Sequence, residues 1–227
     1  MGLFKKESQG ATAVAAPPTA PASSAGVSLV KKGQRVSLEK TPSGVYTLIT
    51  TWGKKDYDLY ALVEYVDGRV EVVSCFGTLS SPLDFSTRTS DDAVIHVSGD
   101  KTAYGDDLPQ EVMTVRLNPD IKCVVPVVYS AKNSGVGSFR KYKVSTYVIE
   151  GQHDVVPQDN TKMISVEAVD ASKDNNVYTF VPAVIHNGPN GPELEGVELY
   201  SRRNSEYRPT VSNGSVTMDS GEENGNK

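Results

Sequence analysis

Short runs rich in valine, tyrosine, threonine and isoleucine follow one another along this chain, bounded mostly by glycine, proline, asparagine and aspartate. The first group of residues favours strands and the second favours turns. The expected strands are 35–40, 45–52, 57–66, 69–77, 94–99, 111–117, 121–130, 142–150, 163–169, 177–186 and 196–203. Between the two ends, no segment has the period of an amphipathic helix over three turns. The sequence therefore predicts an all-β fold, and we favour a β-sandwich of two antiparallel sheets over a barrel.

The clearest turn signal lies in VEYVDGRVEVV, where Asp67 and Gly68 separate two strand-like runs. An Asp-Gly pair suits the two-residue turns of hairpins, because both positions of such a turn need a positive φ. We therefore expect a β-hairpin here, with Asp67 and Gly68 as its turn.

Composition divides the 227 residues into one domain with a tail at each end. Residues 8–26 are mainly alanine, proline and serine without a charged or aromatic side chain, so they cannot bury enough surface to offset their ordering entropy. The residues after Met218 are polar and rich in glycine. We expect a disordered tail over 1–26, a folded domain over 27–217 and a disordered polar tail over 218–227.

The charge and the apolar runs exclude some classes of protein. A net charge of −5 argues against nucleic-acid binding, which needs a basic face. No apolar run reaches the roughly 18 residues of a membrane span, and the start MGLFKKES lacks the apolar core of a secretory signal. Gly2 and the two lysines suggest contact with an anionic membrane, but Lys6 breaks the myristoylation pattern. We expect a cytoplasmic protein that begins with a loose tail.

Four acids crowd the stretch HVSGDKTAYGDDLPQEVMTVRL between two strand-like runs: Asp100, Asp106, Asp107 and Glu111. Counted from Asp100, Gly105 and Glu111 fall where an EF-hand calcium loop has its glycine and its last ligand. Thr102 and Tyr104 occupy ligand positions of that motif, and strands replace its helices, so this is not an EF-hand. A calcium loop of another design and a solvated acidic turn both remain open. Magnesium is less favoured, because it rarely uses all-protein cages.

A second acidic pair lies in WGKKDYDLYALV, at the start of another expected strand. Strand alternation would send the carboxylates of Asp56 and Asp58 to one side of that strand and Leu59 to the other. The two acids are therefore further candidates for a metal site.

Taken in order, four segments resemble the TerD family of tellurium-resistance and general stress proteins. VSLVKKGQRVSLEK resembles the opening strand of the family, and WGKKDYDLYALV is similar to its Trp, Asp-x-Asp-Leu and Ala segment. The stretch 91–117 resembles its His-x-Gly-Asp, Gly-Asp-Asp and Glu signature, with one extra residue before Gly99. PVVYSAKNSGVGSFRKYKVSTYVI is similar to the next strand, a Gly-x-Ser-Phe turn and a further strand. The resemblance covers residues 27–203.

The resemblance implies a β-sandwich whose acidic loops gather at one end and bind Ca²⁺, in a cytoplasmic, non-enzymatic stress protein of bacterial type. The partners it implies are other TerD-type or stress-complex proteins. By position, the calcium ligands would be Asp56, Asp58, Asp100, Asp106, Asp107 and Glu111. Tyr60 and Ala103 stand where the family commonly has acids, so we expect a weaker site or the loss of one of two sites.

The histidines and cysteines do not form a pattern typical of an enzyme active site. His96, His153 and His186 lie far apart and belong to no metal-ligand or nucleophile motif. We expect His96 to make hydrogen bonds beside the acidic loop, and the other two to lie in surface turns. Cys75 and Cys123 lie in strand-like runs, where buried thiols are expected in preference to a disulfide.

The alternative function is a metal-free sandwich that binds a partner protein or a carbohydrate. Carbohydrate modules usually display exposed aromatic residues. This chain has 11 tyrosines but one tryptophan, Trp52, which the resemblance places near the acidic loops.

Overall fold

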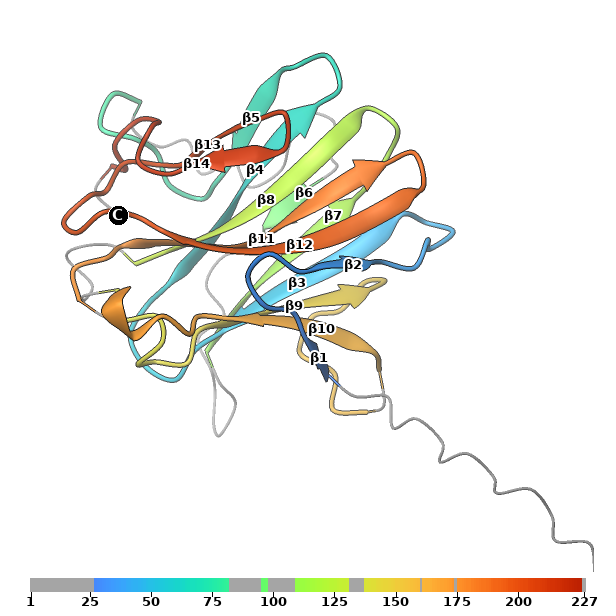
Figure 1. Cartoon of the computed structure of the whole chain (residues 1–227), viewed down its shortest axis with the longest axis horizontal. Coiled ribbons are helices and arrows are strands. Elements are labelled where there is room, and N and C mark those ends of the chain that lie inside the picture. The colour runs from blue at the N-terminus through green and yellow to red at the C-terminus, as the bar shows by residue number, and fades with distance from the viewer. Residues whose placement is uncertain are drawn as a thin grey trace, which may run out of the picture.

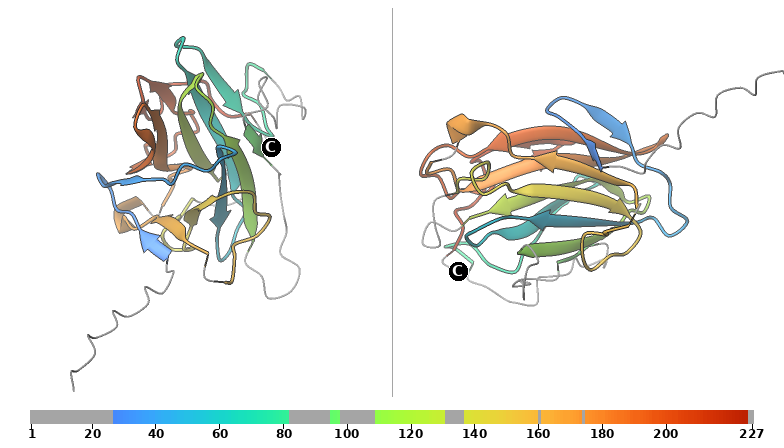
Figure 2. Two further views of the ribbon diagram at one scale, coloured as in Figure 1. Left: turned by 90° about the vertical axis from the view of Figure 1, so that its right-hand side faces the viewer. Right: turned by 90° about the horizontal axis from the view of Figure 1, so that it is seen from below.

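Two six-stranded sheets stack face to face in the computed structural model, which describes residues 27–81, 95–97, 109–130, 137–159, 161–173 and 175–225 (Figure 1). The side views show the two layers and the smaller hairpin outside them (Figure 2). The predicted all-β sandwich is confirmed. No helix among these residues has the length and hydropathy of a membrane span. The expected tail 1–26 lies outside the described residues.

The first sheet has the strand order β1-β10-β9-β3-β7-β6. Its strands are β1 (Val27–Leu29), β10 (Met163–Glu167), β9 (Ser145–Glu150), β3 (Val45–Thr51), β7 (Gln110–Arg116) and β6 (Ile95–Val97). All neighbours pair antiparallel except β1 and β10, which are parallel.

The second sheet has the order β2-β12-β11-β8-β4-β5 and is antiparallel throughout. Its strands are β2 (Arg35–Ser37), β12 (Gly191–Tyr200), β11 (Thr179–Gly188), β8 (Ile121–Tyr129), β4 (Asp58–Tyr65) and β5 (Val70–Val73). A separate hairpin joins β13 (Thr210–Ser212) to β14 (Ser215–Thr217), and a single 3₁₀ turn, η2, covers Ala171–Lys173. Every expected run overlaps an observed strand, although β12 begins five residues earlier than expected, and β1, β13 and β14 were not predicted.

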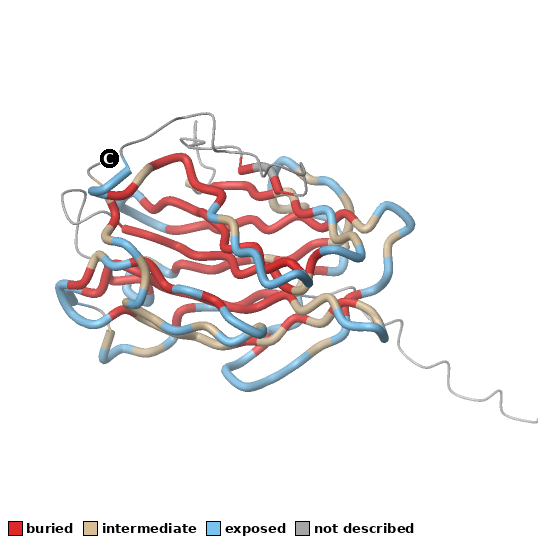
Figure 3. Tube along the Cα trace, turned by 90° about the horizontal axis from the view of Figure 1, so that it is seen from above, coloured by how far each residue is buried: buried red, intermediate tan, exposed pale blue. Residues whose placement is uncertain are grey.

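The central strands are buried on both faces, which explains their nearly continuous apolar sequences. Between the sheets, Leu48 and Met113 pack with Val63 and Val128. On the outer face of the second sheet, a further cluster joins β4, β8 and β11 to Val211 of β13. Buried residues accordingly run along the middle of the strands, and exposed residues gather at the turns (Figure 3).

The segment after β14 differs from its predicted disorder. Residues 218–225 return to the body of the protein, where Asn224 bridges to Thr78 and is 2% exposed. The hairpin before it is closed by Asn213 and Gly214, both with positive φ, which is the Asn-Gly turn that favours hairpins. Composition concealed this order because few apolar residues suffice to dock a short segment on a sheet that is already formed. The prediction of a disordered tail from 218 is therefore wrong for residues 218–225.

The predicted Asp-Gly hairpin joins β4 to β5, but its loop is longer than expected. Tyr65 N–H donates to the carbonyl of Arg69 at 2.9 Å, and Gly68 N–H donates to the carbonyl of Tyr65 at 3.0 Å. These bonds leave three residues in the loop instead of two, with Gly68 at φ +87°. A positive φ is thus needed at the glycine alone, because the loop is a turn followed by a bulge.

Candidate functional site

Three strand ends meet where the sequence places its acidic residues. β3 ends at Thr51, β4 begins at Asp58 and β7 begins at Gln110. Trp52 N–H donates to the carbonyl of Pro109 at 3.2 Å, which joins the end of β3 to the start of β7. We call the edge formed by residues 51–58 and 109–111 the acidic end.

Glu111 lies in β7, opposite Thr50 of β3, and its side chain is fully buried. Alternation places it on the face of Met113, which packs between the sheets. Its carboxylate oxygen Oε2 accepts a hydrogen bond from the backbone N–H of Leu59 in β4. Glu111 therefore links one sheet to the other at the acidic end.

Asp58 is the first residue of β4 and is 2% exposed. It pairs with Tyr129 of β8, and alternation places it on the outer face of its sheet, on the side of Tyr60. Burial raises the pKa of the Tyr129 phenol, and the carboxylates of Glu206 and Asp58 raise it further. Asp58 therefore acts electrostatically on Tyr129 of the outer cluster, although it begins β4 at the acidic end.

The other four predicted ligands have different outcomes. Asp56 is exposed and precedes β4, so the strand alternation assumed for Asp56 and Asp58 does not apply. Asp100, Asp106 and Asp107 lie outside the described residues. The structure thus brings Asp58 and Glu111 to the same end of the sandwich, where Glu111 accepts the N–H of Leu59, the residue after Asp58.

Two buried carboxylates suit a hard cation such as Ca²⁺, which takes six to eight oxygen ligands. Within the described ranges, however, no group of three or more histidine, cysteine, aspartate or glutamate side chains could hold a metal ion. Asp58 also lies on the outer face of the second sheet, whereas Glu111 of β7 lies on the face between the sheets, so a shared ion would need ligands that reach around the start of β4. Asp58 and Glu111 could therefore supply only some of the oxygen ligands of a calcium site.

The histidines occupy three separate places. His96 lies in β6 opposite Thr114. His153 Nε2–H donates to the carbonyl of Glu150 at 2.9 Å, in the turn predicted for it. His186 instead lies within β11, and its Nε2 is 2.8 Å from Glu195 Oε2 on the neighbouring strand. The predicted surface turn at His186 is wrong because the β11–β12 hairpin extends to Gly188.

Both cysteines are buried thiols outside any disulfide, as predicted. Burial, with the nearby carboxylate of Glu64, raises the pKa of the Cys123 thiol to about 12. Trp52 is also buried, and its indole N–H donates to the carbonyl of Lys55 at 2.8 Å. It lies at the acidic end, but its ring is not displayed as a platform for a sugar.

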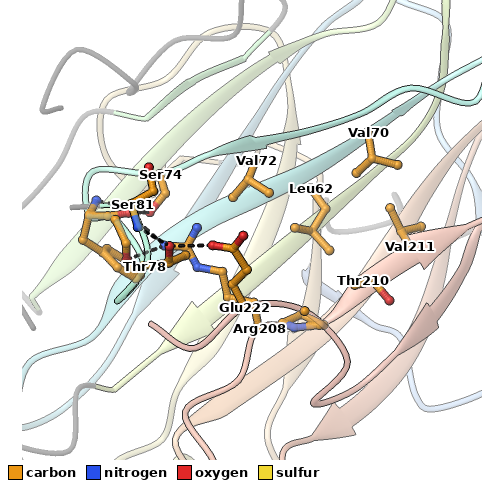
Figure 4. Close-up of a pocket in the computed structure, with 14 residues that line it drawn as sticks. Leu62, Val70, Val72, Ser74, Thr78, Ser81, Arg208, Thr210, Val211 and Glu222 are labelled. Atoms are coloured by element: carbon orange, nitrogen blue, oxygen red, sulfur yellow. Dashed lines mark hydrogen bonds between the residues drawn. The ribbon is translucent and has the colours of Figure 1, made fainter. Parts of the chain in front are cut away.

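Sequence reasoning missed a pocket of about 700 Å³ on the outer face of the second sheet (Figure 4). β4, β5 and the loop after β5 form one wall, and residues 208–222 form the other. Arg208 and Glu222 are its charged residues. The Asn-Gly pair at 213–214 was the one signal that this segment folds back; nothing in the local sequence marks Arg208 as buried.

No protein-family model matches this chain, and no curated protein matches it.

Proposed function

We propose that this protein is a calcium-binding, non-enzymatic β-sandwich, and that Asp58 and Glu111 are two of its ligands. The observation that carries the proposal is the burial of both carboxylates at the acidic end, at 2% and 0% exposure. An ionised carboxylate is costly to bury unless hydrogen bonds or a cation compensate for the lost water.

The protein's own groups prepare the two carboxylates for this role. The Leu59 N–H holds Glu111 Oε2 and so sets the direction of the carboxylate. Asp58 is held at the start of a paired strand, opposite Tyr129. A bound calcium ion would supply the positive charge that offsets repulsion between these carboxylates.

The remaining ligands in this proposal come from the sequence. Asp100, Asp106 and Asp107 would complete the set, and Asp56 would approach from the exposed rim. The resemblance to TerD proteins supports the same assignment and suggests a cytoplasmic stress-response role with related proteins as partners. The bound metal would then hold the acidic end in one arrangement for binding a partner.

Thermal unfolding with and without calcium tests the proposal. In millimolar calcium the wild type should melt at a higher temperature than in chelator. When calcium is at about 100 times its Kd, the free energy of unfolding should rise by about 2.7 kcal/mol. Asp58→Asn and Glu111→Gln should each lose most of this gain. The control is Asp120→Asn, because Asp120 is exposed at the opposite end of β7 and should leave the gain unchanged.

Glu111→Gln is preferred to an alanine variant because the glutamine carbonyl can still accept the Leu59 N–H. If calcium does not change the melting temperature of the wild type, the proposal is overturned. The metal-free interaction module is then the better supported function. Equal losses in Asp120→Asn would show a nonspecific charge effect and would also overturn it.

A further inference from the structure

The pocket on the outer face of the second sheet has one charged end and one apolar end. In Figure 4, the labelled side chains of Ser74, Thr78 and Ser81 gather on the left, whereas Val70 and Val211 lie on the right, with Thr210 beside Val211. Its volume of about 700 Å³ falls within the range of small-molecule sites, about 300–1,000 Å³.

The apolar end exists because the C-terminal segment covers the sheet incompletely. Leu62 of β4 is 1% exposed and pairs in register with Val72 of β5. Val70 and Val72 remain 42% and 38% exposed, while Val211 of β13 closes the opposite side. An apolar group placed between them would remove these valines from water, which is favourable.

Arg208 forms the cationic part of the charged end and is 7% exposed. Its Nε donates to Asn224 Oδ1 at 2.6 Å, and Nη2 donates to the carbonyls of Phe76 and Gly77 at 2.8 Å and 3.0 Å. Its Nη1 donates to no residue in the described ranges. Burial lowers the pKa of the guanidinium, but an arginine stays charged in proteins. The structure thus holds a rigid cation with one donor group to spare.

Glu222 forms the anionic part, at the exposed mouth of the pocket. Its Oε2 accepts hydrogen bonds from Thr78 Oγ1 at 2.6 Å and Ser80 Oγ at 2.7 Å, and these bonds lower the pKa of its carboxyl. Its Oε1 accepts nothing from the residues that the structure describes. Arg208 also lowers the pKa of Glu222 by charge attraction, yet no ion pair joins the two among the described residues. A ligand head group could therefore lie between them.

We propose that this pocket binds a small zwitterion with an apolar side chain, of the chemical class of the free apolar amino acids. The ligand carboxylate would accept from Arg208 Nη1, and its ammonium group would donate to Glu222 Oε1. Its side chain would lie against Val70, Val72 and Val211. A simple fatty acid would meet repulsion from Glu222, and a simple amine would meet repulsion from Arg208, so opposite charges in one head group match the site best.

Calorimetric titration with three probes that share the isobutyl group of leucine tests this chemistry. The probes are leucine, isocaproate, which lacks the amino group, and isoamylamine, which lacks the carboxylate. Leucine should bind at least about tenfold more tightly than either, since each missing group leaves a charged partner unpaired. Absence of leucine binding at millimolar concentration, or equal binding of leucine and isocaproate, would overturn the proposal.

Variants then assign binding to this pocket. Glu222→Gln should erase the preference for leucine over isocaproate, whereas Glu223→Gln, the next residue, does not line the pocket and should keep it. Val72→Ser should weaken leucine binding, while Val66→Ser on the hairpin tip should not, because Val66 is exposed outside the pocket. If the control variants weaken binding as much as the pocket variants, the site is elsewhere and the proposal is wrong.

Arg208 is not changed in these experiments, because its bonds to Asn224 and to the 76–77 backbone make it part of the fold. All titrations are run in chelator. Binding of leucine without calcium therefore tests this pocket alone, independently of the calcium proposal for the acidic end.

Discussion

The carboxylate of Glu111 in β7 accepts the backbone N–H of Leu59 in β4, so a buried charge of one sheet is bonded to the backbone of the other. A carboxylate in this position serves structure and chemistry together. It accepts the backbone N–H of Leu59 at the start of β4, and it places a carboxylate next to the residue that follows Asp58.

This relationship predicts a difference between two substitutions of Glu111 in calcium-free buffer. Glu111→Ala leaves the Leu59 N–H without its acceptor and creates a cavity, so it should lower the free energy of unfolding by about 2–4 kcal/mol. Glu111→Gln keeps an acceptor and should cost less than half as much. Urea unfolding of both variants measures the difference, and equal losses would show that the hydrogen bond contributes little.

The link between Arg208 and Asn224 predicts how firmly the C-terminal segment is attached. Asn224→Ala would leave Arg208 Nε without its acceptor in a buried place, at a cost of about 1.5–3 kcal/mol in unfolding free energy. Asn224→Asp keeps the acceptor and adds a charge opposite to that of the guanidinium, so it should retain stability. Chemical denaturation distinguishes them; an alanine variant as stable as wild type would mean that residues 218–225 are only loosely held.

Glu64 should make stability depend on acid pH. Burial by itself would raise the pKa of its carboxyl, but the N–H groups of Gly214 and Asn213, with Lys122 and Cys123, lower it below its usual 4.5. Its stabilising contribution is therefore present above pH 4.5 and is lost as pH falls through the lower, folded-state pKa.

Glu64→Gln should accordingly cost about 1–2 kcal/mol at neutral pH and progressively less in acid. Unfolding free energies measured across this acid range should converge for wild type and variant. A constant difference at all pH values would contradict the assignment, because an uncharged effect of the side chain does not titrate.

Two glycines with similar backbone angles should respond differently to alanine. Gly33 and Gly137 have φ values of +78° and +60°, which cost an alanine about 1–2 kcal/mol at either position. A Cβ on Gly137 would lie 1.5 Å from the carbonyl oxygen of Val177, whereas a Cβ on Gly33 would meet nothing within 4 Å. Gly137→Ala should therefore lower the melting temperature much more than Gly33→Ala. Similar melting temperatures for the two variants would show that the backbone at Gly137 and Val177 can move apart at little cost.

Local sequence determined which segments became strands. The runs around Val45, Asp58 and Ile121 are rich in β-branched and aromatic residues, which favour strands, and each forms one. The Asp-Gly and Asn-Gly pairs likewise mark real hairpins, at Gly68 and Gly214. Strands and tight turns depend on the backbone preferences of residues that are adjacent in the chain, so they can be predicted from the local sequence.

The sequence also identified acidic residues worth testing, but it could not place them. Asp56 and Asp58 are two residues apart, and alternation suggested one common side; the strand begins only at Asp58, so Asp56 is exposed and Asp58 is buried. Where a strand begins depends on its pairing with Tyr129 of β8, far away in the chain.

Tertiary contacts determined where the pocket forms and where the C-terminal segment packs. Arg208 lies in a polar stretch, and its burial results from acceptors at Phe76, Gly77 and Asn224 that meet only in the folded protein. Burying a charge requires several hydrogen-bond partners, and two of those of Arg208, Phe76 and Gly77, are more than a hundred positions away in the sequence. Local preferences therefore determined the strands, whereas the sites were decided by long-range packing, because burial and charge pairing depend on which distant residues the fold makes neighbours.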